Sequence, residues 1–111
     1  MRPVRRPYDD RTSAGGGPSL PERWVFRLYT VGITPATETA LKNLREICSE
    51  RLAVEPEIQV VDLAREPELA VTHGIFAVPM VVRQAPPPVR KVIGDLSDRD
   101  RAMAGLEMGS L

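Results

Sequence analysis

Apolar side chains dominate residues 24–31, which read Trp-Val-Phe-Arg-Leu-Tyr-Thr-Val and are rich in aromatic and β-branched residues. Trp24, Phe26 and Leu28 share one face of this segment at a period of two. Large apolar residues at a period of two, in an aromatic and β-branched segment, predict a strand. Residues 57–63 carry several β-branched side chains and predict a second strand.

The apolar period between these two strands changes to three and four residues and continues to about Leu52. This spacing predicts a helix with one buried face. Thr34 is expected to cap its first turn, and Pro35 suits the first helical position because a proline there loses no hydrogen bond. Strand, helix and strand together predict a parallel βαβ unit.

Shorter elements are expected further along the chain. Residues 66–73 predict a short helix that ends at Gly74. Residues 75–82 predict a third strand, interrupted by Pro79. Because proline cannot donate to a strand ladder, Pro79 is expected at a sheet edge or at a strand start.

A fourth strand is expected over residues 89–93, ended by Gly94. The spacing of Ser97 and Asp100 is that of a capping box and predicts a last helix, with Ser97 as its N-cap. The nearby carboxylate of Asp95 is interpreted as a partner of this helix start rather than as an acid or base. The predicted fold is α/β, a single domain in the thioredoxin-like order βαβαββα.

Composition separates residues 1–23 from the rest of the chain. This segment is rich in arginine, proline and glycine and contains the run Gly15-Gly16-Gly17. Such a composition predicts a disordered arm, so residues 24–111 are expected to form the folded domain.

The charge balance limits the partners. The 111 residues hold 15 lysines and arginines and 15 acids, with a pI near 6.6, so we expect no nucleic-acid partner. No apolar run approaches the roughly 18 residues that cross a bilayer, and no secretory signal pattern follows the basic start. The sequence therefore predicts a cytoplasmic protein without a membrane partner.

Thioredoxin-type catalysis needs a reactive thiol at the start of the first helix. That place reads Gly32-Ile33-Thr34-Pro35, and the single cysteine, Cys48, lies on the apolar face of the helix. We expect Cys48 to be buried and the protein not to be an enzyme. His73 is interpreted as a surface residue at a helix end, and neither a metal site nor a cofactor is expected.

Two features of the second half leave alternatives open. Pro79 fits a cis-proline as well as an ordinary edge-strand proline, and Pro86, Pro87 and Pro88 fit slow conformational switching as well as a stiffened loop. Basic residues flank these prolines. They fit a patch for an acidic partner as well as solvated charges that protect a sheet edge, and they are Arg83, Arg90 and Lys91.

The block Pro-Pro-Pro-Val-Arg-Lys-Val-Ile-Gly-Asp-Leu-Ser at residues 86–97 closely resembles the KaiB family of bacterial clock proteins. The resemblance extends from residue 24 to about residue 108. It includes Tyr29-Thr30-Val31-Gly32-Ile33-Thr34-Pro35 and Ala77-Val78-Pro79.

This resemblance implies a non-enzymatic partner of the KaiC ring, an ATPase and autokinase, and of KaiA if the organism has it. It also implies exchange between a monomeric thioredoxin-like fold that binds KaiC and a ground-state fold that differs in the C-terminal half. The ground state is expected to self-associate as a dimer or tetramer. An oligomeric stress-related or scaffold protein without a KaiC partner is the alternative.

The resemblance also identifies residues expected to influence the preferred fold. Trp24 stands where the family usually has tyrosine, and Glu107 stands where aspartate is commoner. The complete set of switch candidates is Trp24, Pro79, Pro86, Pro87, Pro88, Gly94, Asp95, Gly105 and Glu107. The partner-binding candidates are Arg83, Arg90 and Lys91.

Overall fold

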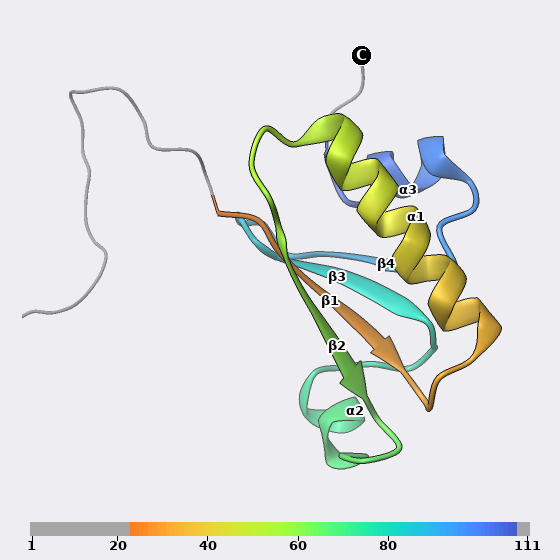
Figure 1. The fold of residues 1–111 in the computed structure, drawn as a ribbon. Helices are drawn as coiled ribbons and strands as arrows, with labels where there is room; N and C mark the ends of the chain where they lie inside the picture. Colours follow the sequence, from red (N-terminus) through yellow and green to blue (C-terminus); the bar gives the residue numbers. More distant parts are fainter. Residues whose placement is uncertain (1–22, 109–111) are drawn as a thin grey trace, which may run out of the picture.

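A four-stranded sheet organises the chain in the computed structural model, which describes residues 23–108. The elements follow in the predicted order and are β1 (Val25–Thr30), α1 (Pro35–Arg51), β2 (Glu57–Asp62), α2 (Glu68–Thr72), β3 (Met80–Ala85), β4 (Arg90–Ile93) and α3 (Arg99–Gly105). The arm expected over residues 1–23 lies outside the described residues except for Arg23. Figure 1 shows the arrangement, which has the predicted order βαβαββα.

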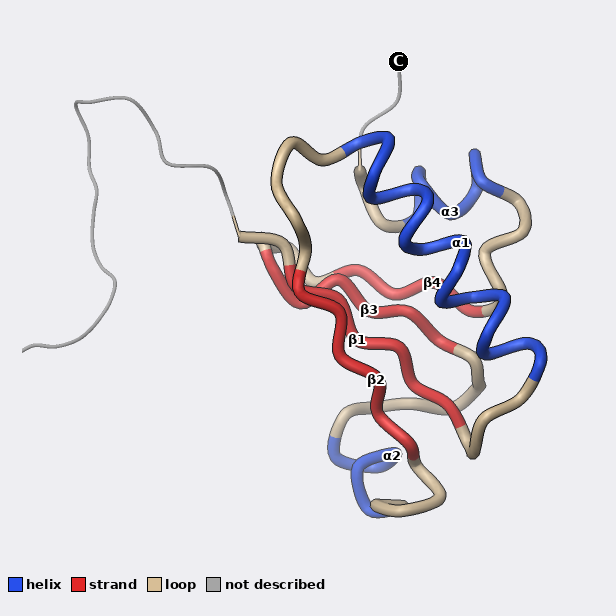
Figure 2. The backbone as a smooth tube through the Cα atoms, in the orientation of Figure 1, coloured by secondary structure: helices blue, strands red, loops and turns tan. Residues whose placement is uncertain are grey.

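The strand order in the sheet is β2-β1-β3-β4. β1 pairs with β2 in parallel, as the βαβ pattern predicted, whereas β3 is antiparallel to both β1 and β4. β1 and β3 are therefore the central strands, and β2 and β4 are the edges. Helices α1 and α3 lie over one face of the sheet, and α2 lies beyond the end of β2 (Figures 1 and 2).

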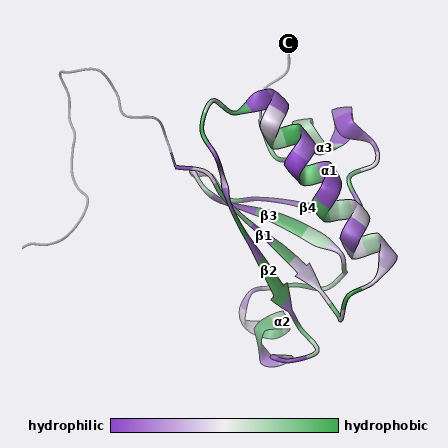
Figure 3. Ribbon diagram, viewed as in Figure 1, coloured by the Kyte–Doolittle hydropathy of each residue, from purple (hydrophilic) through white to green (hydrophobic). Residues whose placement is uncertain are grey.

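Two hydrophobic clusters follow from the alternation of side chains along the strands. The larger one lies between the sheet and helices α1 and α3, and it includes Phe26, Leu28, Leu44, Ile47 and Leu106. The smaller one lies on the opposite face, where Tyr29, Leu63, Ile75, Met80 and Val82 pack with residues of α2. Figure 3 shows hydrophobic and hydrophilic residues alternating along α1, as expected for a helix with one buried face.

The start of β3 differs from the prediction. Residues 75–79 are not part of a strand, and β3 begins only at Met80, directly after Pro79. The Ile75 side chain packs in the smaller cluster, while Phe76 is 80% exposed. Pro79 lies before a central strand, so the expectation of an edge-strand proline was wrong and that of a strand start was right.

The N-cap of α3 also differs from the prediction. Asp98, not Ser97, caps this helix, because its carboxylate accepts a hydrogen bond from the Arg101 amide at 3.2 Å. The predicted cap of α1 is confirmed, since the Thr34 hydroxyl accepts from the Thr37 amide at 3.1 Å. None of the helices in residues 23–108 is long and apolar enough to cross a membrane.

Candidate functional site

Several of the predicted switch and partner-binding residues meet at the C-terminal end of α3. We call Trp24, Arg83, Pro88, Arg90 and Glu107 the Arg83 cluster. Strand pairing explains how they meet: Arg83 on β3 lies opposite Phe26 of β1 and Arg90 of β4. The cluster therefore joins the first strand to the end of the last helix.

Arg83 is the centre of this cluster and is only 4% exposed. Its guanidinium donates to the main-chain carbonyl of Glu107 at 2.9 Å and to that of Pro88 at 3.0 Å. The guanidinium carbon also lies 5.2 Å from the centre of the Trp24 ring, a cation–π distance. Nε has no hydrogen-bond partner within the described residues. Arg83 thus holds three segments together rather than facing solvent.

The burial of Arg83 corrects the expected basic patch. Arg83 and Arg90 point to the face of the sheet that carries α3, while Lys91 points to the other face because side chains alternate along a strand. The three basic residues therefore do not share one exposed surface. Contact with a partner remains a prediction for Arg90 and Lys91.

Glu107 follows α3 with a left-handed backbone, at a φ of 52°. Its carboxylate forms an ion pair with Arg90 at the protein surface. Gly105, two residues earlier, packs so closely on β4 that an added Cβ would lie 2.5 Å from Cγ2 of Val92. The end of α3 is therefore fitted to β4 through these residues.

Prolines lie directly before and directly after β3. The peptide bond between Val78 and Pro79 is cis, so the cis alternative holds in this structure. The bonds before Pro86 and Pro88 are also cis, in the connection between β3 and β4. Pro87 and Pro88 are exposed, and the Pro88 carbonyl accepts from Arg83. Whether these prolines take part in switching stays a prediction.

Gly94 and Asp95 lie at the other end of β4, away from the Arg83 cluster. Gly94 has a φ of 114°, and its amide donates to the Pro79 carbonyl at 2.8 Å. Hydrogen bonds from Ser97 hold the pKa of the Asp95 carboxyl below its usual value. The Asp95 main-chain carbonyl accepts from the Asn43 side chain of α1 at 2.9 Å. Asp95 thus shapes the turn into α3, in line with the structural interpretation of its carboxylate.

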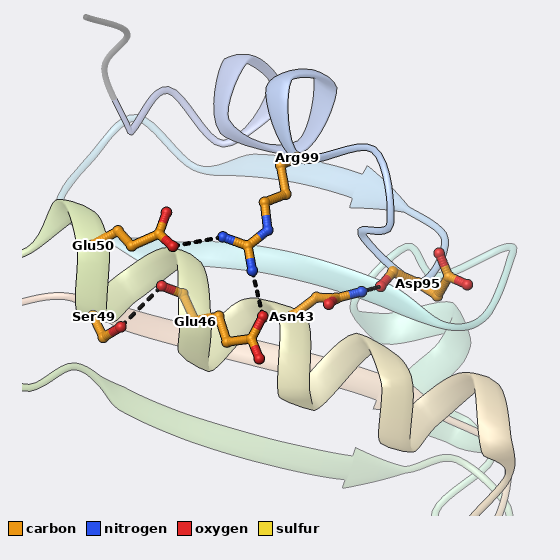
Figure 4. A network of polar contacts seen from close by, with 6 residues as sticks. All are labelled: Asn43, Glu46, Ser49, Glu50, Asp95 and Arg99. Carbon is orange, nitrogen blue, oxygen red and sulfur yellow. Dashed lines mark hydrogen bonds and ion pairs between the residues drawn. The ribbon is translucent and has the colours of Figure 1, made fainter.

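A polar network between α1 and α3 was not predicted (Figure 4). Arg99 of α3 binds the carboxylate of Glu46 and that of Glu50, the latter at 2.8 Å. These contacts, led by the hydrogen bond to Glu50, raise the pKa of the Arg99 guanidinium. The available sequence signal was the pair of acids four residues apart on α1, which places both on one side of the helix.

Cys48 is 2% exposed, as predicted, and burial raises the pKa of its thiol to about 12. A thiol with this pKa holds almost no thiolate near neutral pH and is a poor nucleophile. No group of three or more potential metal ligands occurs within residues 23–108.

His73 was expected to be a surface residue, and the structure corrects this. It is half-buried, and its Nδ1 lies 2.8 Å from the hydroxyl of the buried Tyr29. The two rings meet edge to face, with centroids 5.7 Å apart. His73 therefore helps to attach the end of α2 to the sheet.

Comparison with known proteins places this geometry in a family. The model of the KaiB domain matches residues 27–108. The circadian clock oscillator protein KaiB of Trichodesmium erythraeum is 40% identical over 89 residues, which cover 80% of this chain and 86% of the relative. The protein of the same name from Microcystis aeruginosa is 41% identical over 85 residues, covering 77% and 82%.

Solved structures agree on the fold. The N-terminal domain of SasA from Synechococcus elongatus aligns with a TM-score of 0.65 at 19% identity, covering 89% of this chain and 97% of that domain. Mitochondrial thioredoxin 3 of Saccharomyces cerevisiae aligns with a TM-score of 0.55 at 12% identity, covering 73% and 76%. The chain therefore has the thioredoxin-like arrangement of strands and helices.

Proposed function

The chain belongs to the KaiB family, and on that premise we propose that it is a cytoplasmic, non-enzymatic circadian clock protein that binds the ATPase ring of a KaiC-like protein. KaiA is a further partner if the organism has it. The observation that carries the proposal is the family match over residues 27–108, the same part of the chain that forms the thioredoxin-like fold.

Binding rather than catalysis is supported by the place where thioredoxins hold their reactive thiol. The turn before α1 contains no cysteine, and the single thiol of the chain is buried on the inner face of α1. The fold therefore offers surfaces and strand edges but no thiol at the start of α1. The protein is expected to modulate the phosphorylation or ATPase cycle of the ring without turning over a substrate.

The proposal includes a change of fold. The thioredoxin-like state binds the ring, and a self-associated ground state folds the C-terminal half differently. The structure supports a division of the chain into two halves. In the first half, β1, α1 and β2 form a continuous βαβ unit. In the second half, Arg83 binds the carbonyls of Pro88 and Glu107. Exchange between the two states is a population shift toward the fold that the ring selects.

Size-exclusion chromatography with light scattering tests the proposal. The full-length protein is measured alone and after long incubation with the KaiC homologue of the same organism and ATP. Slow co-elution with the ring is expected. Absence of a complex in every nucleotide state would overturn the proposal and favour the oligomeric scaffold alternative.

The predicted partner contact of Lys91 is tested in the same experiment. Lys91→Glu is expected to reduce co-elution, because it reverses a charge on the exposed edge strand β4. Lys42→Glu is the matched control, since Lys42 is the only other lysine and is exposed on α1. Equal co-elution of the two variants would remove Lys91 from the contact.

A further inference from the structure

The sheet face opposite α1 and α3 carries a row of side chains that crosses all four strands. Arg27 of β1 pairs in register with Gln59 of β2 and with Val82 of β3, and Val82 pairs with Lys91 of β4. Residues paired in register point to the same face of a sheet. Arg27 and Lys91 therefore stand on one face with a single strand between them, roughly 10 Å apart at the backbone.

A hollow of about 250 Å³ opens on this face. Arg27, Gln84 and Lys91 line it from three strands, and His73 lines it from the end of α2. Val82, between the two cations, is only 2% exposed. The hollow is thus bordered by two positive charges and an amide above an apolar residue.

Hydrogen bonds hold these side chains in place. Nε of Arg27 donates to the Gln59 side chain at 3.0 Å, and its Nη1 lies 3.4 Å from the hydroxyl of Tyr29. Tyr29 in turn contacts His73, and Nζ of Lys91 lies 3.5 Å from the His73 carbonyl. These contacts link both cations to the same Tyr29–His73 pair.

Neither cation has an acidic partner in the part of the chain that the structure describes. Within residues 23–108 the ion pairs involve other side chains, and no carboxylate lies within 4 Å of Arg27 or Lys91. Glu57, the nearby acid on β2, is bound by Arg23 and by the Gln59 amide. The two positive charges beside the hollow are therefore available to a ligand.

We propose that this hollow binds an oxyanion, the phosphate or carboxylate group of a small ligand, between Arg27 and Lys91. A guanidinium and an ammonium together provide the charge-assisted hydrogen bonds that such groups accept, and the Gln84 amide adds a neutral donor. The partly fixed guanidinium of Arg27 loses little conformational freedom on binding. This site does not depend on the proposed binding of a KaiC-like ring.

Nuclear magnetic resonance on the full-length, nitrogen-15-labelled protein tests this site. Inorganic phosphate and succinate are titrated separately against sodium chloride at matched ionic strength. We expect saturable shifts of the amide signals of Arg27, His73, Gln84 and Lys91. Saturation by phosphate and not by succinate identifies a phosphate site, and the reverse identifies a carboxylate site.

Two variants that each remove one positive charge distinguish binding of the anion at this site from its general electrostatic attraction to the protein. Lys91→Gln is expected to weaken the apparent affinity at least tenfold, whereas Lys42→Gln on α1 leaves it unchanged. The spectrum of each variant shows whether it keeps the fold, and Arg27→Gln is a second test of the site. Shifts that do not saturate with either anion, or equal affinities for both lysine variants, would overturn the proposal. Because no ring is present, this result is separate from the test of the proposed function.

Discussion

Arg83 shows how a single residue can link distant segments. A buried charge without an acidic partner is costly unless its hydrogen bonds are satisfied. Arg83 meets most of this requirement with two main-chain carbonyls and the face of the Trp24 ring. Its bonds run to Pro88 and Glu107, so it attaches both the proline connection and the end of α3 to β3.

Replacing Arg83 by methionine is expected to destabilise the thioredoxin-like fold. The variant keeps an apolar chain beside Trp24 but leaves the carbonyls of Pro88 and Glu107 without their donor. Loss of such a partner costs about 1–3 kcal/mol in the free energy of unfolding. Urea unfolding measures the change, with Arg101→Met as the control because Arg101 is exposed on α3. Equal stabilities of the two variants would contradict the account of the Arg83 cluster.

The thiol of Cys48 is expected to react very slowly in the folded protein. With a pKa of about 12, its thiolate fraction at pH 8 is roughly a thousandfold below that of a free cysteine with a pKa near 8.5. The rate of reaction with a disulfide reagent, followed by absorbance, measures this. The reaction should be slow in the native protein and fast in urea. A native rate like that of glutathione would contradict the burial of this thiol.

At the scale of elements, the C-terminal end of α3 carries backbone strain. Glu107 adopts the left-handed conformation at a φ of 52°, which glycine accepts without penalty. Glu107→Gly should therefore be more stable than Glu107→Ala by about 1 kcal/mol, since both variants lose the pair with Arg90 and only alanine keeps a Cβ. Chemical unfolding of the two variants makes the comparison. A more stable alanine variant would exclude this source of strain.

The contact between α1 and α3 is expected to depend on salt. Arg99 binds Glu46 and Glu50 with partly exposed side chains, so each pair contributes at most about 1 kcal/mol. Arg99→Gln should lower the unfolding free energy at low ionic strength, and the difference from wild type should shrink in about 1 M salt, where the screening length is short. Arg45→Gln, on the exposed side of α1, is the control. An unchanged difference in high salt would refute the ionic contribution.

The first three elements could be predicted because their signals are local. The alternation in β1, the period of α1 and its Thr34 cap all depend on neighbours in the sequence. The start of β3 depends instead on pairing with β1, a distant strand. Ile75 and Phe76 have strand-like side chains, yet one enters the smaller cluster and the other is exposed.

The candidate site was only partly predictable for a similar reason. The resemblance identified Trp24, Gly105 and Glu107, but arginine is usually a surface residue, and nothing in the sequence near Arg83 indicates its burial. Its position becomes clear only when β3 is paired between β1 and β4. Asp98 is the N-cap of α3 in place of the predicted Ser97. Both residue types are good N-caps, and the path of the chain into α3 decides between them.

At the scale of the whole molecule, the two halves are held together by the central position of β3. This strand belongs to the second half of the chain but pairs with β1 of the first. Arg99 then attaches α3 to α1 of the same βαβ unit, and Arg83 attaches the end of α3 to β3. The proposed ground state folds the second half differently, so we expect it to lose these contacts, which is why they mark the proposed ring-binding state.

Hydrogen exchange of the protein bound to its KaiC-like ring tests the central claim most directly. If the ring selects the thioredoxin-like fold, the bound protein protects the Gly94 amide, which donates to Pro79, and the Leu106 amide, which donates to Ala102. Protection of both amides, together with those of the β3–β4 ladder, is the predicted result. Rapid exchange at these positions in a stable complex would show that the ring binds a different fold and would contradict the account.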